Sequence, residues 1–141
     1  MPNIARSLDI AARPSQVWRH LADQEGLRRW MLPDLEIDLR PGGAYRATGA
    51  DGTGITGTVL EIVPEGRLIL SWFEQDAGWV HPARLVVSLQ AISTGCRVEL
   101  VHDGFAGIGT DRWQQTEAAY ERGADAHRIL PALADVVESA A

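Results

Sequence analysis

Histidines and a tyrosine are the side chains of this sequence best suited to proton transfer. The four histidines are His20, His81, His102 and His127. None of them forms a helical i, i+4 pair with another or a ligand cluster with the single cysteine, so the sequence predicts no metal site. An imidazole with a pKa near neutrality can give or take a proton at physiological pH. His102, His127 and Tyr120 are therefore the candidate catalytic residues if the protein is an enzyme.

Two periodicities would bring such side chains together. His102 lies on a predicted strand and shares its face with apolar residues, which directs it toward a core. Tyr120 and His127 lie seven residues apart on one helical stripe, and Glu74 alternates with Trp72 on another strand. These side chains could converge in a cavity and act as acid and base on a carbonyl compound, as in a cyclase or dehydratase. The alternative is that His102 and Tyr120 are hydrogen-bonded core residues and that His127 fills space.

The elements that position these residues follow from hydrophobic periodicity. Alternating apolar residues predict seven strands, at 3–11, 34–40, 44–48, 55–63, 67–74, 83–92 and 96–103. Two short helices are expected between the first two strands, from Pro14 to about Ala22 and from Asp23 to about Trp30. One long helix is expected from 111 to about 138. This order predicts an α+β domain over residues 1–141, in which a curved seven-stranded antiparallel sheet wraps around a long C-terminal helix.

Four segments carry a resemblance to a known family. They are VWRHLADQEGLRRWM, the PGG turn followed by Tyr45, GTVLEIVPEGRL leading to Trp72, and GCRVELVHDGF. Their order and spacing resemble the START-like (SRPBCC, birch-pollen-allergen-like) superfamily, and within it the bacterial AHSA-type proteins similar to the C-terminal domain of the heat-shock protein ninety ATPase activator. The resemblance covers about residues 3 to 138. It implies the helix-grip fold and a cavity between sheet and C-terminal helix, but no single activity, because the superfamily hosts binders, lipid carriers and cyclases.

The last helix departs from the family pattern. A Gly-Trp pair is usual four residues before a leucine, and here Asp125 and Ala126 precede Leu130. Pro131 removes a backbone donor, which predicts a kink at a cost of about 3 kcal/mol in a helix interior. Small residues and a kink in place of a tryptophan predict a roomier cavity than is usual in the family. The alternative is that Trp113 or another ring fills the gap, since protein interiors tolerate few large voids.

Aromatic residues are further candidates for ligand contact, since the chain has five Trp beside two Tyr and two Phe. Trp30 and Met31 stand where a short helix gives way to a strand, and we expect them to close or line the cavity mouth. The alternative is that the Trp30 ring only fills space at one end of the core. Trp79 lies in a turn, where exposed aromatics mark interaction surfaces, so it either covers the cavity mouth or joins a homodimer contact. The alternative for Trp79 is a ring folded back on its hairpin.

Charge and hydropathy argue against several classes. A formal net charge of −6 argues against nucleic-acid binding, which needs a clustered excess of Lys and Arg. No apolar run approaches the roughly 18 residues of a membrane span. The start lacks signal-peptide features and Cys96 cannot form an internal disulfide, so we expect a cytoplasmic protein. The letters GTGITG at 52–57 fit a dinucleotide fingerprint, but a strand pattern follows them where a helix is needed, so no cofactor is expected.

These observations favour a binding protein for a small apolar or aromatic molecule, held in a cavity between the sheet and the C-terminal helix. Concave sites lined by aromatics with a few polar groups are the usual form of such sites. The expected ligand contacts are Trp30, Met31, Trp72, Glu74, His102, Phe105, Trp113, Tyr120 and His127. Two alternatives remain open: the acid–base enzyme described above, and a co-chaperone-like protein-interaction module, as the family name suggests.

Overall fold

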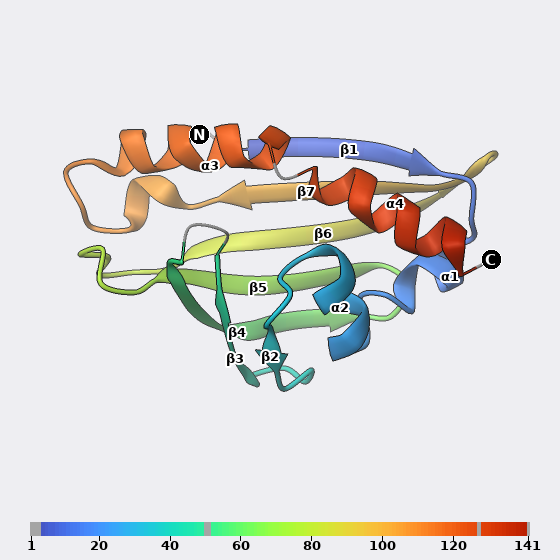
Figure 1. Cartoon of the computed structure of the whole chain (residues 1–141), viewed down its shortest axis with the longest axis horizontal. Helices are drawn as coiled ribbons and strands as arrows, with labels where there is room; N and C mark the ends of the chain where they lie inside the picture. The colour runs from blue at the N-terminus through green and yellow to red at the C-terminus, as the bar shows by residue number, and fades with distance from the viewer. Residues whose placement is uncertain (1–3, 50–51, 127, 141) are drawn as a thin grey trace.

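The computed structural model describes residues 4–49, 52–126 and 128–140. Its centre is a curved antiparallel sheet of seven strands in the order β1-β7-β6-β5-β4-β3-β2 (Figure 1). The strands are β1 (Ile4–Ile10), β2 (Glu36–Ile37), β3 (Ala44–Thr48), β4 (Gly54–Val63), β5 (Arg67–Glu74), β6 (Ala83–Ile92) and β7 (Gly95–Asp103). The helices are α1 (Pro14–Trp18), α2 (Gln24–Trp30), the 3-10 turn η1 (Phe105–Gly107), α3 (Trp113–Ala126) and α4 (Ile129–Ser139). The predicted α+β helix-grip architecture is confirmed.

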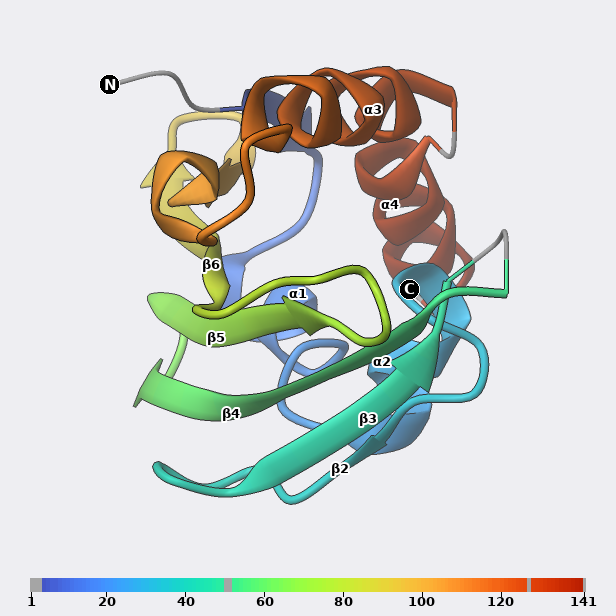
Figure 2. The ribbon, with the colours of Figure 1, turned by 90° about the vertical axis from the view of Figure 1, so that its left-hand side faces the viewer.

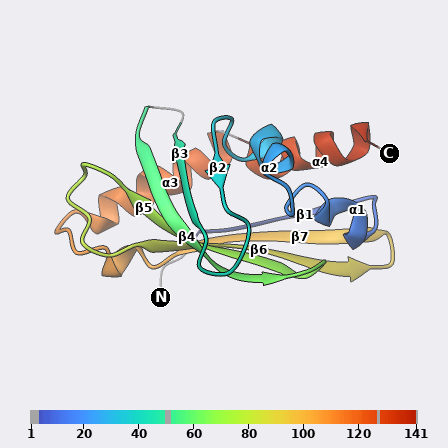
Figure 3. The same cartoon turned by 90° about the horizontal axis from the view of Figure 1, so that it is seen from below.

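Strand register gathers the apolar side chains on the concave face of the sheet. Leu8 pairs with Val98, and Val98 with Leu89, so one apolar row crosses three strands, buried at Val98 and Leu89 and partly buried at Leu8. In the neighbouring row Arg6 pairs with Leu100. Helices α2, α3 and α4 lie on this same side of the sheet (Figure 3). The core therefore lies between the concave face and the helices, because burying apolar side chains there removes them from water.

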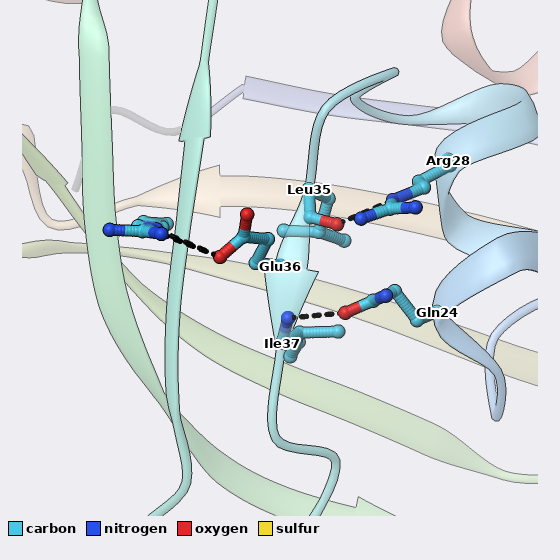
Figure 4. A network of polar contacts seen from close by, with 6 residues as sticks. Gln24, Arg28, Leu35, Glu36 and Ile37 are labelled. Atoms are coloured by element: carbon cyan, nitrogen blue, oxygen red, sulfur yellow. Dashed lines mark hydrogen bonds and ion pairs between the residues drawn. The ribbon is translucent and has the colours of Figure 1, made fainter.

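The predicted strand at 34–40 is wrong in extent, because only Glu36 and Ile37 pair with β3. Side chains of α2 bind the backbone on the outer edge of this short strand (Figure 4). Oε1 of Gln24 accepts a hydrogen bond from the Ile37 N–H at 2.9 Å, and Nε of Arg28 donates to the Leu35 carbonyl at 2.7 Å. An unpaired sheet edge is a template for association with other chains, and these side chains occupy part of it.

The expected single helix from 111 to about 138 is wrong, because α3 ends at Ala126 and α4 begins at Ile129. Figure 2 shows the two helices running in different directions. Between them Arg128 has left-handed backbone angles, φ 49° and ψ 50°, which interrupt a right-handed helix. Pro131 is not the point of the break. It lies in the first turn of α4, where a backbone N–H has no intrahelical acceptor, so proline costs little there.

The predicted helix from Pro14 to about Ala22 is shorter than expected and ends at Trp18. A turn at residues 19–21 and a bend at residues 22–23 follow before α2 begins. The chain here passes very close to α2, since a Cβ added to Gly26 would stand 2.8 Å from Cα of His20. Only glycine permits this approach, which brings the turn at His20 against α2.

Candidate functional site

Aromatic rings from β5, β7, η1 and α3 meet on the concave face at one end of the sheet. The centroid of the His102 ring lies 5.0 Å from that of Trp72, 4.8 Å from Phe105 and 5.1 Å from Tyr120. Trp79 joins them, with its centroid 6.2 Å from Phe105 and 6.3 Å from Tyr120. Most of these pairs have the edge-to-face or tilted geometry that aromatic quadrupoles favour. We call these five residues the ring cluster.

A chain of hydrogen bonds ties α3 to β5 through the ring cluster. The Tyr120 hydroxyl donates to Oε2 of Glu74 at 2.8 Å and accepts from Nε1 of Trp72 at 3.1 Å. Trp72 and Glu74 are two residues apart on β5, so both side chains leave the same face of the strand. One hydroxyl thus acts as donor and acceptor at once, which fixes the angle of the Tyr120 side chain.

His102 is the buried titratable group of the ring cluster. Its side chain is only 6% exposed, and within the described residues its Nε2 atom has no hydrogen-bond partner. Burial lowers the pKa of His102 from 6.5 to about 3, while the nearby Asp103 opposes this by a smaller amount. The imidazole is therefore neutral near pH 7 and a weak base. This argues against the general-base role expected for His102, because an effective base has a pKa near the working pH.

Trp79 is a residue that sequence reasoning did not place among the ligand contacts. Its ring is 7% exposed and lies against Phe73 as well as the ring cluster. The turn that carries it is held to the segment after η1, because the Val80 N–H donates to the Ile108 carbonyl at 2.7 Å. The ring folds back onto its own hairpin, which was the stated alternative. An aromatic in a turn pattern was the only available signal, and it does not show which way a ring points.

The remaining predicted contacts are not part of the ring cluster. Trp30 is 4% exposed on α2, and its Nε1 donates to the His20 carbonyl at 2.8 Å, as expected of a ring that plugs the core. Met31 and Trp113 are partly buried and pack against the core. His127 lies outside the described residues. Figure 1 shows α2, the helix that carries Trp30, and α3, the helix that carries Tyr120, over different ends of the sheet.

A hollow of about 350 Å³ opens where α3 gives way to α4. It lies between this helix break and strands β1 and β7, and apolar side chains of Leu8, Leu100, Ile129, Leu130 and Pro131 form much of its wall. The residues that line it also include Arg6, Ser7, Ala124 and Arg128. None of the nine was among the predicted ligand contacts. The signals available were Arg6 on the apolar face of its strand and the small residues before Pro131.

The hollow and the ring cluster are neighbours. Leu100 stands two residues before His102 on the same face of β7, and Ala124 follows Tyr120 by four residues on α3. Residues four apart on a helix lie on the same side, one turn from each other. The hollow and the ring cluster therefore share β7 and α3, although none of the five rings lines the hollow.

Other kinds of site have little support within the described part of the chain. No group of three His, Cys, Asp or Glu side chains in residues 4–49, 52–126 and 128–140 is arranged to hold a metal ion. None of the described helices is both long enough and apolar enough to cross a membrane. The hollow at the helix break, with its mostly apolar lining, is the candidate ligand site.

The sheet, the helices on its concave face and the rings between them define this chain as a helix-grip domain. The chain belongs to the family described as "Activator of Hsp90 ATPase homolog 1-like protein", whose model matches residues 11–134. The resemblance noted in the sequence is therefore confirmed. No curated protein matches the chain by sequence at a significant level.

Solved structures from three bacteria share the fold over nearly the whole chain. A protein from Mesorhizobium loti has a TM-score of 0.81 at 16% identity, over 98% of both chains. The solution structure of the Aha1 dimer from Colwellia psychrerythraea has a TM-score of 0.73 at 18% identity, over 98% of this chain and 97% of that one. A protein from Chromobacterium violaceum has a TM-score of 0.72 at 26% identity, over 96% of each chain.

Proposed function

We propose that this protein binds a small, largely apolar or aromatic molecule between the concave face of the sheet and the C-terminal helices. The observation that carries the proposal is the hollow at the helix break, with its apolar wall. Its volume of about 350 Å³ falls near the lower end of the roughly 300–1,000 Å³ of typical ligand sites. A molecule of one or two rings is the size that fits.

The ring cluster supports the same proposal. An aromatic ligand makes with aromatic side chains the same edge-to-face and offset contacts that the rings of the cluster make with one another. The unpartnered Nε2 of His102 is a further reason, since buried polar atoms are nearly always paired and the exceptions gather at functional sites. A ligand that reaches from the hollow to the rings would contact the predicted residues Trp72, His102 and Tyr120.

Native mass spectrometry of the freshly purified protein tests the proposal first, followed by denaturation to identify any released molecule. Titration with the neutral fluorophore N-phenyl-1-naphthylamine tests it in solution. Leu100→Trp, which places a large ring in the hollow, is expected to weaken binding about tenfold. The matched control is Leu60→Trp, because Leu60 is 51% exposed on β4 and does not line the hollow. Equal binding by both variants would contradict the proposal, as would an empty protein that binds no probe.

The family description supports a second candidate, a co-chaperone-like interaction with heat-shock protein ninety. We rank it lower because that description is a family name, and the ligand proposal rests on a described feature of this chain. A pull-down with purified chaperone and purified chain decides the matter. Specific recovery of the chaperone, competed by untagged chain, would establish the second candidate.

The dimer formed by the relative from Colwellia psychrerythraea suggests a homodimer for this chain as well. Light scattering coupled to size-exclusion chromatography distinguishes a mass of one chain from a mass of two. We also propose a cytoplasmic location, supported by the free Cys96, since unpaired thiols are usual in reducing compartments. Fractionation of cells that express the tagged chain tests the location.

A further inference from the structure

We propose that the outer edge of β1 binds the same edge of a second copy of this chain, so that two sheets join through antiparallel β1 strands with Leu8 at the two-fold axis. The inference rests on the homodimer proposed above and adds the surface that forms it. β1 is the last strand at one end of the sheet order, and β7 is the only strand that pairs with it in the described part of the chain. The other side of β1 is thus a row of backbone groups that a further strand can bind.

β1 is a long and regular edge strand. It pairs with β7 without a break from Ile4 to Ile10, and its sequence, IARSLDI, contains neither proline nor lysine, which often protect a sheet edge. Ala5 and Ser7 are small and exposed, so they leave room beside the backbone. Helices α3 and α4 lie on the concave side of the sheet (Figure 3), and none of the described strands extends the sheet beyond β1.

The opposite edge of the sheet, at β2, is protected. β2 has two residues, and side chains of Gln24 and Arg28 bind backbone groups on its outer side. A very short strand and a covered edge both prevent association with another strand. On β1, Arg6 acts in a similar way only near the beginning of the strand, where its Nη1 donates to the Ala5 carbonyl at 2.9 Å. The remainder of β1 is where we expect pairing.

A second copy fits this edge because two identical antiparallel strands are related by a two-fold axis, and such a contact is self-complementary. Charge limits the register. An axis at Arg6 places two arginines opposite each other and an axis at Asp9 places two carboxylates opposite each other, and like charges directly opposite are destabilising. An axis at Ser7 uses the Ala5 backbone, whose carbonyl already accepts from Arg6. An axis at Leu8 avoids all three conflicts.

The register with Leu8 at the axis also gives the neighbouring side chains suitable partners. Leu8 is partly buried, and contact with Leu8 of the second copy removes more of its apolar surface from water. Ser7 lies opposite Asp9 of the second copy, where a hydroxyl can donate to a carboxylate. Asp9 keeps its ion pair with Arg97, because a carboxylate accepts several hydrogen bonds. Arg6, Ser7 and Leu8 also line the hollow, so the second copy lies beside the proposed ligand site.

Sedimentation velocity over a dilution series measures the dissociation constant of the dimer for the native chain and for Ser7→Glu. The new carboxylate lies opposite Asp9 of the second copy, twice in each dimer, so we expect the dissociation constant to rise about tenfold. Ser88→Glu is the matched control, because Ser7 and Ser88 flank Glu99 from its two sides in one row of the sheet. Ser88 lies on β6, which has a strand on each side, so this variant is expected to leave the constant unchanged.

Two further measurements locate the contact. Hydrogen exchange of the native chain, followed by NMR, is expected to slow at the outward-facing amides of β1 as the concentration rises, and to stay constant in β3. Leu8→Cys is expected to give a disulfide-linked dimer on mild oxidation, since directly opposite residues have Cα atoms about 4.5–5.5 Å apart, within the range of a disulfide. The native chain is the control for Cys96, which is buried. Circular dichroism melting identifies any variant that fails to fold.

The outcomes separate the surface from the dimer. A dimer that Ser7→Glu does not weaken, or whose β1 amides exchange as fast as in the monomer, overturns the inference and leaves the homodimer intact. A folded Leu8→Cys dimer that oxidation does not cross-link overturns the axis at Leu8, and with it the inference as stated. A native chain that stays monomeric at the highest soluble concentration overturns both the inference and the homodimer. Protection of β1 that rises with concentration, together with weakening by Ser7→Glu and not by Ser88→Glu, supports both.

Discussion

Replacing His102 with leucine should remove a large part of the acid sensitivity of this protein. The pKa of His102 is about 3 in the folded chain and 6.5 in the unfolded chain. Between these values the unfolded state binds a proton that the folded state does not, so the free energy of unfolding falls as the pH falls from about 6.5 toward 3. With 1.36 kcal/mol for each pKa unit, the loss between pH 7 and pH 5 is about 2 kcal/mol.

Urea unfolding at pH 7 and pH 5 measures this loss in the native chain and in His102→Leu. Carboxyl groups with a lowered pKa, such as those of Asp9 and Asp34, also reduce the free energy of unfolding in acid. They do so equally in both proteins, so their contribution cancels in the difference between them. His81→Gln changes an exposed histidine in a turn and serves as the matched control. If His102→Leu and the native chain lose the same stability between the two pH values, the imidazole reaches solvent and the argument from its burial is wrong.

Three further substitutions probe two hydrogen bonds and one left-handed backbone position. Tyr120→Phe deletes the hydroxyl that bonds to Glu74, and urea unfolding is expected to show a loss of about 1–2 kcal/mol. Gln24→Ala removes the acceptor of the Ile37 N–H, so hydrogen exchange at that amide is expected to accelerate and stability to fall by about 1 kcal/mol. Glu65→Gly relieves a left-handed residue, φ 61°, and a higher melting temperature is expected, with a gain of about 0.5 kcal/mol after the added freedom of the unfolded chain. Two results would contradict the hydrogen bonds: an unchanged exchange rate at Ile37 in Gln24→Ala, or an unchanged urea midpoint for Tyr120→Phe. A lower melting temperature for Glu65→Gly would contradict the argument from backbone strain.

The strands were predictable because alternation of apolar residues is a local signal. Six of the seven predicted strands agree with the structure to within one residue at each end, and a seventh exists but is short. The exception, β2, pairs with β3 only at Glu36 and Ile37, and its outer edge meets side chains of α2 in place of another strand. Where α2 packs is not encoded in the alternation of residues 34–40.

The candidate site was predictable in the part that follows from periodicity. His102, His127, Tyr120 and Glu74 were expected to converge. The structure brings His102, Tyr120 and Glu74 together with Trp72 and Phe105, and His127 lies outside the described residues. Trp79 was not expected there, because a turn does not specify the direction of its side chains. A cavity beneath the last helix was expected from its small residues, but the residues that line the hollow were not, because the left-handed Arg128 interrupts a helical pattern otherwise continuous along the chain.

What the sequence by itself determined was the set of elements, their order and the faces that become core, because each depends on repeats of two or about 3.6 residues. The tertiary structure alone decided where the C-terminal helix breaks, how completely the ring cluster is packed and where a hollow remains. These depend on contacts between residues far apart in the chain, as when Arg6 of the first strand and Arg128 of the last helical segment come to line the same space. Local periodicity contains no information about such distances, so the lining of the hollow became visible only in the fold.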